Sequence, residues 1–167
     1  MVNTAESSPR PLPQEQSVLA SDGTPIFRGL WNPKVLARFF KPSDLAGRRV
    51  LDMGANRGGL SLELARLGAN VHAAEPVLDN GLARDIALKE GLSIEWSTAA
   101  LFDSHTLGKF DVVVCFGLLY HFRNPHYVLD YLSSLAAPIL YVSTLSCCRF
   151  SGRPPKLTPP VARTQLG

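Results

Sequence analysis

The sequence predicts a doubly wound α/β domain, in which helices cover both faces of a mostly parallel sheet. From residue 49 onward, apolar strand patterns alternate with helical patterns, and the connections between them are short. A glycine-rich turn also follows the first strand directly, within the stretch VLDMGANRGGLSLELARLG at 50–68. Alternation of this kind implies right-handed crossovers between parallel strands.

The alternating segments follow one another without an internal repeat. The first predicted strand, 48–54, leads into a helix that ends at Gly68, and the second strand is followed by a helix that ends at Gly91. The fourth strand, FDVVVCFG, is an unbroken apolar run, so we expect it to be buried on both faces. The remaining predicted strands are 70–76, 93–98, 110–117 and 139–144, and the helices are 59–68, 78–91 and 126–138.

The two ends of the chain have a different composition from this domain. Residues 1–22 are rich in Ser, Pro, Gln and Glu and predict a disordered leader before a domain at 23–145. A short helix is expected between the cap Asn32 and the stop Pro42, with Val35, Leu36, Phe39 and Phe40 on its apolar face. Residues 146–167 form a basic, proline-rich tail that should not add a strand.

Composition narrows the class of protein. A chain of 167 residues with 46% hydrophobic residues and a mean hydropathy of +0.06 is typical of one globular core. No apolar run approaches the roughly 20 residues of a membrane span, and the first residues lack the pattern of a secretory signal. Cys115, Cys147 and Cys148 form neither a disulfide framework nor a spaced metal set, so we expect a cytoplasmic protein without a metal site.

The net charge of +3 does not by itself indicate a polyanion partner. Residues 149–167 contribute four basic side chains and no acidic one, and the rest of the chain has 13 basic against 14 acidic residues. The excess is therefore a property of the tail.

The turn after the first strand predicts a ligand that contains ribose. Gly54, Gly58 and Gly59 allow the backbone to approach a ligand closely, and the following helix offers free N–H groups. Glu75 ends the second strand, where a carboxylate can accept hydrogen bonds from both ribose hydroxyls.

Two classes of ligand compete for this turn. A dinucleotide needs G-x-G-x-x-G, and here Asn56 stands at the middle glycine position. Asp52 would also repel a pyrophosphate, by about 3 kcal/mol for two unit charges at ~5 Å and an effective dielectric of ~20. S-adenosylmethionine carries a sulfonium and an ammonium instead, which Asp52 attracts. A Walker loop is excluded because no Gly-Lys-Ser/Thr follows.

These motifs resemble those of the class I S-adenosylmethionine-dependent methyltransferases, over roughly residues 25–145. LDMGANRGG is similar to their first motif, and the acid-proline pair at 75–76 to their second. The segment FDVVVCFGLLYHFRNPHYVLDYL at 110–132 is especially similar to the wobble-uridine tRNA carboxymethyl-transfer enzymes and related small-molecule methyltransferases. The resemblance implies a Rossmann-like methyltransferase fold and S-adenosyl-L-methionine as cofactor.

The resemblance also implies which positions contact the cofactor. Glu75 would hold the ribose, and Phe116 and Gly117 would face the sulfonium end. The chain around Ala99, Ala100 and Leu101 would flank the adenine by backbone groups, because no acid occurs there before Asp103. The positions that would line the methionine end are Asp52, Gly54, Asn56 and Gly58.

Candidates for chemistry follow the fourth strand. His121 can accept a proton from an oxygen or nitrogen nucleophile, beside Tyr120, and Arg123 can steer an anionic group of the substrate. The alternative is that this segment only shapes a loop, with Asn124 capping the next helix and Pro125 in its first turn. His72, His105 and His126 show no clustering and fit ordinary surface or strand positions.

The methyl acceptor stays open between a small molecule and an RNA such as tRNA. The Asp/Asn-Pro-Pro-aromatic signature of amino-methylating enzymes is absent, which disfavours DNA amines. Only 23 residues follow Thr144, so we expect the sheet to lack the usual C-terminal strand pair and to expose an edge, which a protein partner or a second copy could cover. A truncated, catalytically weak cofactor-binding homologue is the second interpretation, and a nicotinamide-dependent oxidoreductase the third.

Overall fold

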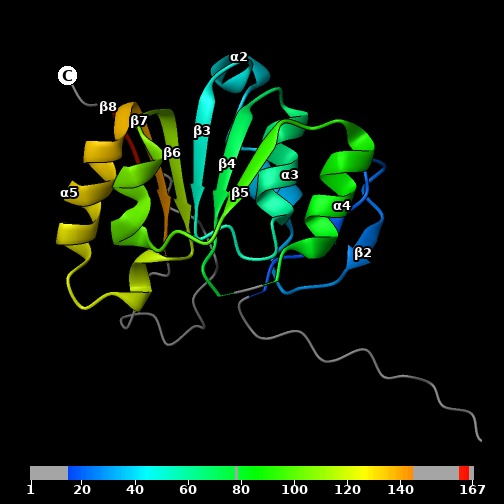
Figure 1. Ribbon diagram of the computed structural model, residues 1–167, viewed down its shortest axis with the longest axis horizontal. Helices are drawn as coiled ribbons and strands as arrows, with labels where there is room; N and C mark the ends of the chain where they lie inside the picture. The colour runs from blue at the N-terminus through cyan, green and yellow to red at the C-terminus, as the bar shows by residue number, and fades with distance from the viewer. Residues whose placement is uncertain (1–14, 78, 145–161, 166–167) are drawn as a thin grey trace, which may run out of the picture.

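The strands of the central sheet lie in the order β5-β4-β3-β6-β7-β8 (Figure 1). The first five pair in parallel, so their carboxyl ends share one edge, the lower edge in Figure 1. This order confirms the predicted doubly wound, mostly parallel sheet. The strands are β3 (Arg49–Met53), β4 (Asn70–Ala74), β5 (Ile94–Ser97), β6 (Phe110–Phe116), β7 (Ala136–Ser143) and β8 (Ala162–Gln165).

The computed structural model describes residues 15–77, 79–144 and 162–165. The predicted leader up to residue 14, the tail residues 145–161 and 166–167, and with them Cys147 and Cys148, lie outside the described residues. Every helix in the described ranges is too short or too polar to cross a membrane.

Helices cover both faces of the sheet. Helix α5 (Pro125–Leu135) packs on one face, and α3 (Gly59–Arg66) and α4 (Gly81–Glu90) pack on the other (Figure 1). Two 3-10 helices, η1 (Leu101–Leu107) and η2 (Leu119–His121), follow β5 and β6. Asn32 caps α1 (Pro33–Ala37) as predicted, through its side-chain oxygen and the Lys34 N–H at 3.0 Å.

The alternating side chains of the strands divide the core into two layers. Val50, Val112 and Val114 pack toward α3, whereas Leu51 and Val113 pack toward α5. From Val112 to Phe116 every residue of β6 is buried, which confirms the expectation for its apolar run. Burial on both faces anchors the strand ends that carry the candidate site.

The helix predicted between Asn32 and Pro42 is shorter than expected. It ends at Ala37, and Pro42 begins a separate helix, α2 (Pro42–Leu45). Phe40 is buried and its ring packs edge-on against Tyr141 at 4.7 Å. Val35 and Phe39, however, are 47% and 36% exposed, so the predicted apolar face is only partly buried.

Two expectations for the chain ends are wrong. Residues 162–165 form β8, which pairs antiparallel with β7 and covers the edge that we expected to be exposed. Edge pairing uses main-chain hydrogen bonds, so it does not require the apolar periodicity that the tail lacks. Only this one strand follows β7 in the part of the chain that the structure describes.

Residues 15–22, which we assigned to a disordered leader, are part of the domain. Residues 15–19, here called the N-terminal strap, lie against α3 and include β1 (Val18–Leu19), which pairs with β2 (Pro25–Phe27). Val18 is fully buried beside Leu62 and Ala83. Glu15 and Gln16 are also buried, and their polar groups have protein partners. Composition alone predicts disorder because it cannot reveal such partners.

Gly58 gives a testable consequence of this packing. Its φ is +80°, and an added Cβ would lie 2.7 Å from the Trp96 ring and 2.8 Å from the Ala83 methyl. We expect Gly58→Ala to lower the free energy of unfolding by about 2–5 kcal/mol, from left-handed backbone strain plus overpacking. Gly47→Ala is the matched control, since its φ is +74° but nothing lies within 4 Å of the added Cβ. Equal losses in urea denaturation of both variants would contradict the packing role of Gly58.

Candidate cofactor-binding site

The turn after β3 lies at the carboxyl edge of the sheet, next to the end of β4. The backbone N–H groups of Gly54 and Ala55 both donate to the Ala74 carbonyl, at 3.0 and 3.1 Å. Gly54 has a φ of +75°, which a glycine adopts without strain. The turn is thereby tied to the neighbouring strand at the edge where open α/β sheets bind ligands.

Asn56 takes the backbone conformation that a middle glycine would take. Its φ is +57°, the only positive value for a non-glycine residue in the described ranges. Asparagine tolerates the left-handed region better than most residues. Its backbone N–H donates to the Glu75 carboxylate at 2.9 Å, and its side-chain oxygen accepts the Gln16 N–H at 2.9 Å. The departure from glycine therefore adds a side-chain contact without changing the turn.

Glu75 lies directly beyond β4, as predicted. One carboxylate oxygen accepts the Asn56 N–H, and the other accepts the Val77 N–H at 2.9 Å. These bonds orient the carboxylate at the strand edge. Because each carboxylate oxygen can accept more than one hydrogen bond, the group can also receive ribose hydroxyls.

Asp52 is the most deeply buried charge of the site. It is 1% exposed, on β3, and accepts a hydrogen bond from the Ser61 hydroxyl of α3 at 2.6 Å. Burial raises the pKa of Asp52 from 3.8 to about 6, the Ser61 bond opposes this, and the charge of Glu75 adds to it. Asp52 therefore remains mainly ionised at neutral pH and becomes neutral in mild acid.

Gly58 and Phe116 have packing contacts that the sequence did not indicate. The space where a side chain of Gly58 would lie is filled by Trp96 and Ala83, so its lack of a Cβ is explained by protein contacts. Phe116 is 6% exposed and its ring stacks on Phe40 with centroids 6.0 Å apart. Any contact of Phe116 with a ligand would therefore come from its backbone.

The residues after β6 divide into two groups. Gly117 lies at the strand end with a φ of +73°, and an added Cβ would be 3.6 Å from the Tyr120 hydroxyl. Burial raises the pKa of Tyr120, so the phenol stays protonated at neutral pH. His121 and Arg123 are exposed, although the His121 ring lies 4.4 Å from the Tyr120 ring. The structure thus places Tyr120, rather than His121 or Arg123, beside the strand end.

Asn124 and Pro125 match the alternative interpretation of this loop. The Asn124 side chain accepts the Tyr127 N–H at 3.2 Å, and Pro125 is the first residue of α5. The segment therefore caps a helix, whatever other role its neighbours have.

The segment expected to flank the adenine begins η1. Ala100 precedes this helix and is exposed, whereas Leu101 is 5% exposed and packs among Met53 and Ala74. Asp103 lies in the first turn of η1 and is exposed. The Leu101 side chain thus belongs to the hydrophobic core next to the ends of β3 and β4.

Sequence reasoning missed the N-terminal strap. Arg57 donates to the Glu15 carboxylate at 2.6 and 3.0 Å, and its guanidinium lies over the Phe27 ring at 4.6 Å. The Leu60 N–H at the start of α3 donates to the Gln16 side chain at 2.9 Å. No periodic apolar pattern marks these residues, so no local signal identifies them.

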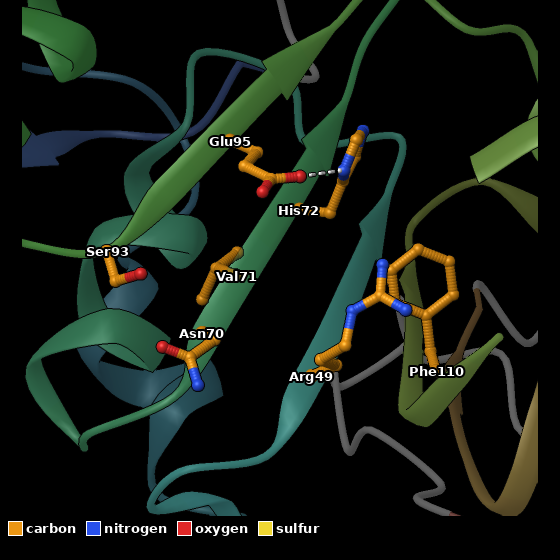
Figure 2. Close-up of a pocket in the computed structure, with 7 residues that line it drawn as sticks. All are labelled: Arg49, Asn70, Val71, His72, Ser93, Glu95 and Phe110. Atoms are coloured by element: carbon orange, nitrogen blue, oxygen red, sulfur yellow. Dashed lines mark hydrogen bonds and ion pairs between the residues drawn. The ribbon is translucent and has the colours of Figure 1, made fainter. Parts of the chain in front are cut away.

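A separate hollow lies at the opposite edge of the sheet (Figure 2). Its lining includes the residues at the starts of β3, β4 and β6, among them Arg49, Asn70 and Phe110. His72 in this hollow bridges the Glu95 carboxylate at 3.1 Å and the Ser97 hydroxyl at 2.9 Å. These are contacts between neighbouring strands, away from the turn, in line with an ordinary strand position for His72.

Comparisons with known proteins identify the family of the domain. A family model described as a methyltransferase domain matches residues 28–147. An enzyme of Xanthomonas euvesicatoria named ubiquinone biosynthesis O-methyltransferase is 36% identical over 121 residues, which are 69% of this chain and 50% of that protein. Its counterpart in Aeromonas salmonicida is 35% identical over 64% of this chain and 47% of that protein. The chain thus spans about half the length of the curated relatives it matches.

Solved structures give the same result. The N-terminal domain of EvdMO1, crystallised with S-adenosylhomocysteine bound, aligns with a TM-score of 0.57 at 34% identity, over 68% of this chain and 49% of that one. Magnesium protoporphyrin IX methyltransferase of Synechocystis PCC 6803, with S-adenosylmethionine bound, aligns with a TM-score of 0.58 at 25% identity, over 66% and 56%. The predicted Rossmann-like methyltransferase fold is confirmed.

The buried carboxyl of Asp52 predicts a pH dependence of stability. Because its folded pKa is about 6 and its ordinary value is 3.8, the folded protein holds the proton more tightly between these values. Stability due to this group is therefore present at low pH and is lost as pH rises through 6, by up to about 3 kcal/mol. We expect Asp52→Asn to be more stable than the wild type at about pH 8, with a smaller difference at about pH 5. Urea denaturation at both values measures this, and a pH-independent difference would contradict it.

Proposed function

The chain belongs to the methyltransferase-domain family, and we propose that it is an S-adenosylmethionine-dependent methyltransferase acting on a small molecule. One observation carries the proposal: Asp52 near the end of β3, Gly54 and Asn56 in the turn that follows, and Glu75 beyond β4 come together at the carboxyl edge of the sheet. In that arrangement the charge of Asp52 would attract a cationic methyl donor, and the Glu75 carboxylate would accept hydrogen bonds from a ribose. Neighbours of the same fold were crystallised with S-adenosylmethionine or S-adenosylhomocysteine.

The proposed cofactor contacts follow the order of the strands. The methionine end would lie on the turn, near Asp52, Gly54 and Asn56, where the buried charge of Asp52 favours the ammonium and sulfonium groups. Glu75 would accept the ribose hydroxyls. The adenine would lie along the backbone at Ala100 and Leu101, and the sulfonium end would face Gly117.

Methyl transfer asks little covalent chemistry of the protein. The bound cofactor supplies an activated methyl group, and the protein aligns an acceptor atom in line with it, which contributes about 7–11 kcal/mol as effective molarity. The Tyr120 hydroxyl lies near Gly117 and stays protonated, so it can donate a hydrogen bond that orients the acceptor. His121 is exposed one residue further on and is the candidate base that removes a proton from a hydroxyl acceptor.

The aromatic side chains around η1 favour a small, partly apolar acceptor. Phe102 is 40% exposed, and its ring lies 5.5 Å from that of Tyr127 and 5.9 Å from that of Phe122. These rings lie on elements that follow the carboxyl ends of β5 and β6. The curated relatives are named as O-methyltransferases, so we propose that the acceptor atom is a hydroxyl oxygen. An RNA acceptor such as tRNA has less support, since the basic excess of the chain lies in the tail.

A cofactor-binding protein without transfer activity is the second candidate function. It is favoured by one observation: His121 and Arg123, the predicted base and steering residue, are exposed, whereas Tyr120, which lies beside the end of β6, stays protonated at neutral pH and is no base.

Cofactor binding is tested directly by calorimetry with S-adenosylhomocysteine, S-adenosylmethionine and NAD. We expect both adenosyl compounds to bind and NAD not to bind. Glu75→Ala should weaken binding of S-adenosylhomocysteine about tenfold or more, because two hydrogen bonds to a charged group are lost. Glu95→Ala is the control, since that carboxylate is 79% exposed and pairs with His72 of β4 in the hollow of Figure 2, away from the turn. Binding of NAD alone would refute the assignment.

Transfer activity is tested with labelled S-adenosylmethionine and a panel of phenolic small molecules, with tRNA in parallel. We expect label in the phenols. If His121 is the base, we expect His121→Ala to lower kcat and to leave KM unchanged. We expect Tyr120→Phe to raise KM by about tenfold, which corresponds to the loss of one hydrogen bond. Binding of the cofactor without label in any acceptor would favour the second candidate function.

A further inference from the structure

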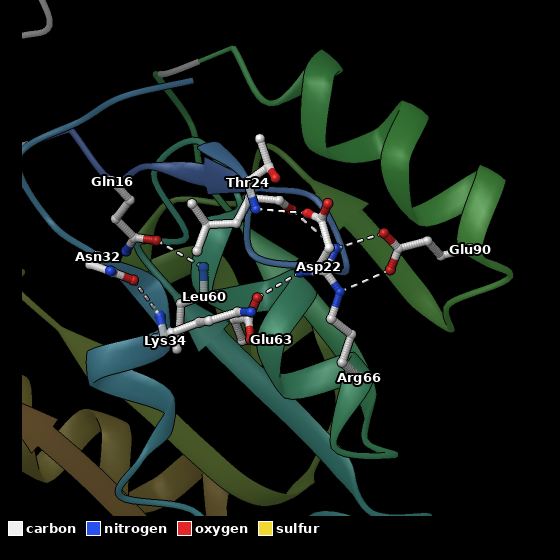
Figure 3. Close-up of polar contacts among 10 residues, drawn as sticks. Gln16, Asp22, Thr24, Asn32, Lys34, Leu60, Glu63, Arg66 and Glu90 are labelled. Carbon is white, nitrogen blue, oxygen red and sulfur yellow. Dashed lines mark hydrogen bonds and ion pairs between the residues drawn. The ribbon is translucent and has the colours of Figure 1, made fainter. Parts of the chain in front are cut away.

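The start of α3 is covered by the N-terminal strap rather than open to the site. The Leu60 N–H, in the first turn of this helix, donates to the side-chain oxygen of Gln16 at 2.9 Å (Figure 3). Gln16 is 5% exposed, and its own backbone N–H donates to the Asn56 side chain at 2.9 Å. One residue of the strap thus contacts both the helix start and the turn.

The strap lies so close to α3 that only glycine fits beneath it. A Cβ added at Gly59, the first residue of α3, would lie 2.1 Å from the Ser17 carbonyl oxygen. On the other side of the strap, a Cβ added at Gly29 would lie 2.3 Å from the Glu15 carbonyl oxygen. The strap therefore packs between two backbones, with no space for a ligand between it and the helix.

Charged side chains hold the strap at both ends. Glu15 is 3% exposed and pairs with Arg57 of the turn at 2.6 Å. At the other end, Arg66 donates to the Leu19 carbonyl at 3.1 Å and pairs with Glu63 and Glu90 (Figure 3). Removal of a single contact should therefore leave the strap in place.

The helix start that Gln16 occupies is the position where a dinucleotide phosphate would bind. Phosphates bind at this point in open α/β sheets because the first N–H groups of the helix are free and its dipole favours negative charge. Here the Leu60 N–H already has a partner, a neutral amide oxygen. A phosphate would have to displace a buried side chain.

We propose that Gln16 is a specificity-determining residue of the cofactor site, which excludes phosphate-bearing nucleotides by occupying the Leu60 amide. This rests on the proposed function, since it explains how the site selects an adenosyl compound without phosphate. Asn56 supports this role, because its side-chain oxygen accepts the Gln16 N–H of the strap while its backbone N–H orients Glu75. A glycine at position 56 would keep the turn but lose the hydrogen bond to the strap.

The main experiment compares three variants at the strap, with inorganic phosphate as the probe. In Gln16→Ala the Leu60 amide loses its partner, and we expect phosphate titration to shift its NMR signal, together with about tenfold weaker binding of S-adenosylhomocysteine. Gln16→Glu keeps an acceptor for that N–H, so it should stay unresponsive to phosphate. A folded Gln16→Ala protein whose Leu60 signal ignores phosphate would overturn the proposal.

Ser17→Ala is the matched control within the strap. Its hydroxyl donates to the Gly29 carbonyl at 3.2 Å and accepts the Gly29 N–H at 3.0 Å, and the residue is 9% exposed. The variant removes both of these hydrogen bonds from the same segment, and we expect the Leu60 signal to remain unresponsive to phosphate. A response equal to that of Gln16→Ala would mean that the anion reaches the Leu60 amide while the strap and Gln16 stay in place, and would refute the role of Gln16.

A second pair of variants tests displacement of the strap without any substitution in the strap itself. Gly59→Ala forces a methyl against the Ser17 carbonyl, whereas Gly81→Ala, at the first position of α4, meets only the flexible Asp79 side chain at 3.1 Å. We expect only Gly59→Ala to show the phosphate response. Should neither Gln16→Ala nor Gly59→Ala fold, the wild type decides: a phosphate-induced shift of its Leu60 amide overturns the proposal, and an unshifted, exchange-protected amide supports it.

These outcomes are separable from failure of the proposed function. If the wild type binds no S-adenosylhomocysteine, the proposed function fails while the Leu60 amide still reports on phosphate exclusion. If the wild type binds it and Gln16→Ala responds as the wild type does, only the role of Gln16 fails.

Discussion

The hydrogen bond from the Asn56 N–H to the Glu75 carboxylate is the contact on which the candidate site depends. It joins the turn after β3 to the end of β4, two segments that are neighbours only because Met53 and Ala74 are paired in register. A slip of one residue in that register would move Glu75 away from the turn and reverse the faces of its strand. The apolar packing on both sides of β3 and β6 maintains the register, so the core serves the site.

The site has a cost in stability. Asp52 is a carboxylate in the core, with the Ser61 hydroxyl as its neutral partner, and its raised pKa shows that burial outweighs the hydrogen bond. A buried charge without an opposite charge beside it destabilises a fold. Its presence at the ligand edge is reasonable if a cationic ligand supplies the missing partner, which is the arrangement that we propose.

The two proposed means of ligand selection are independent. Asp52 would act by its charge and weaken as it is protonated, whereas Gln16 would act by occupying a donor and does not titrate. The strap that carries Gln16 is held to the turn by Arg57 and to the end of α3 by Arg66. In our interpretation, selectivity against phosphate therefore persists in mild acid, where attraction of the cationic donor declines.

The sequence by itself determined the five parallel strands, the helices α3, α4 and α5 and their order, since the apolar periods of the strands and the Gly91 stop of α4 are local properties. It also determined that Asp52, Gly54, Asn56 and Glu75 would meet, because parallel strands bring their carboxyl ends to one edge. Local patterns could not show that Trp96 fills the space beside Gly58 or that Phe116 stacks on Phe40, since both contacts join distant segments.

Only the tertiary structure decided the role of the chain ends. Gln16 and Glu15 lie in a polar segment without period, and they are buried because the Leu60 N–H and the Arg57 guanidinium satisfy their polar groups. The β8 strand likewise depends on the free edge of β7 rather than on its own sequence. In each case the stabilising partner is supplied by a part of the chain far away in sequence, so no local pattern could have predicted it.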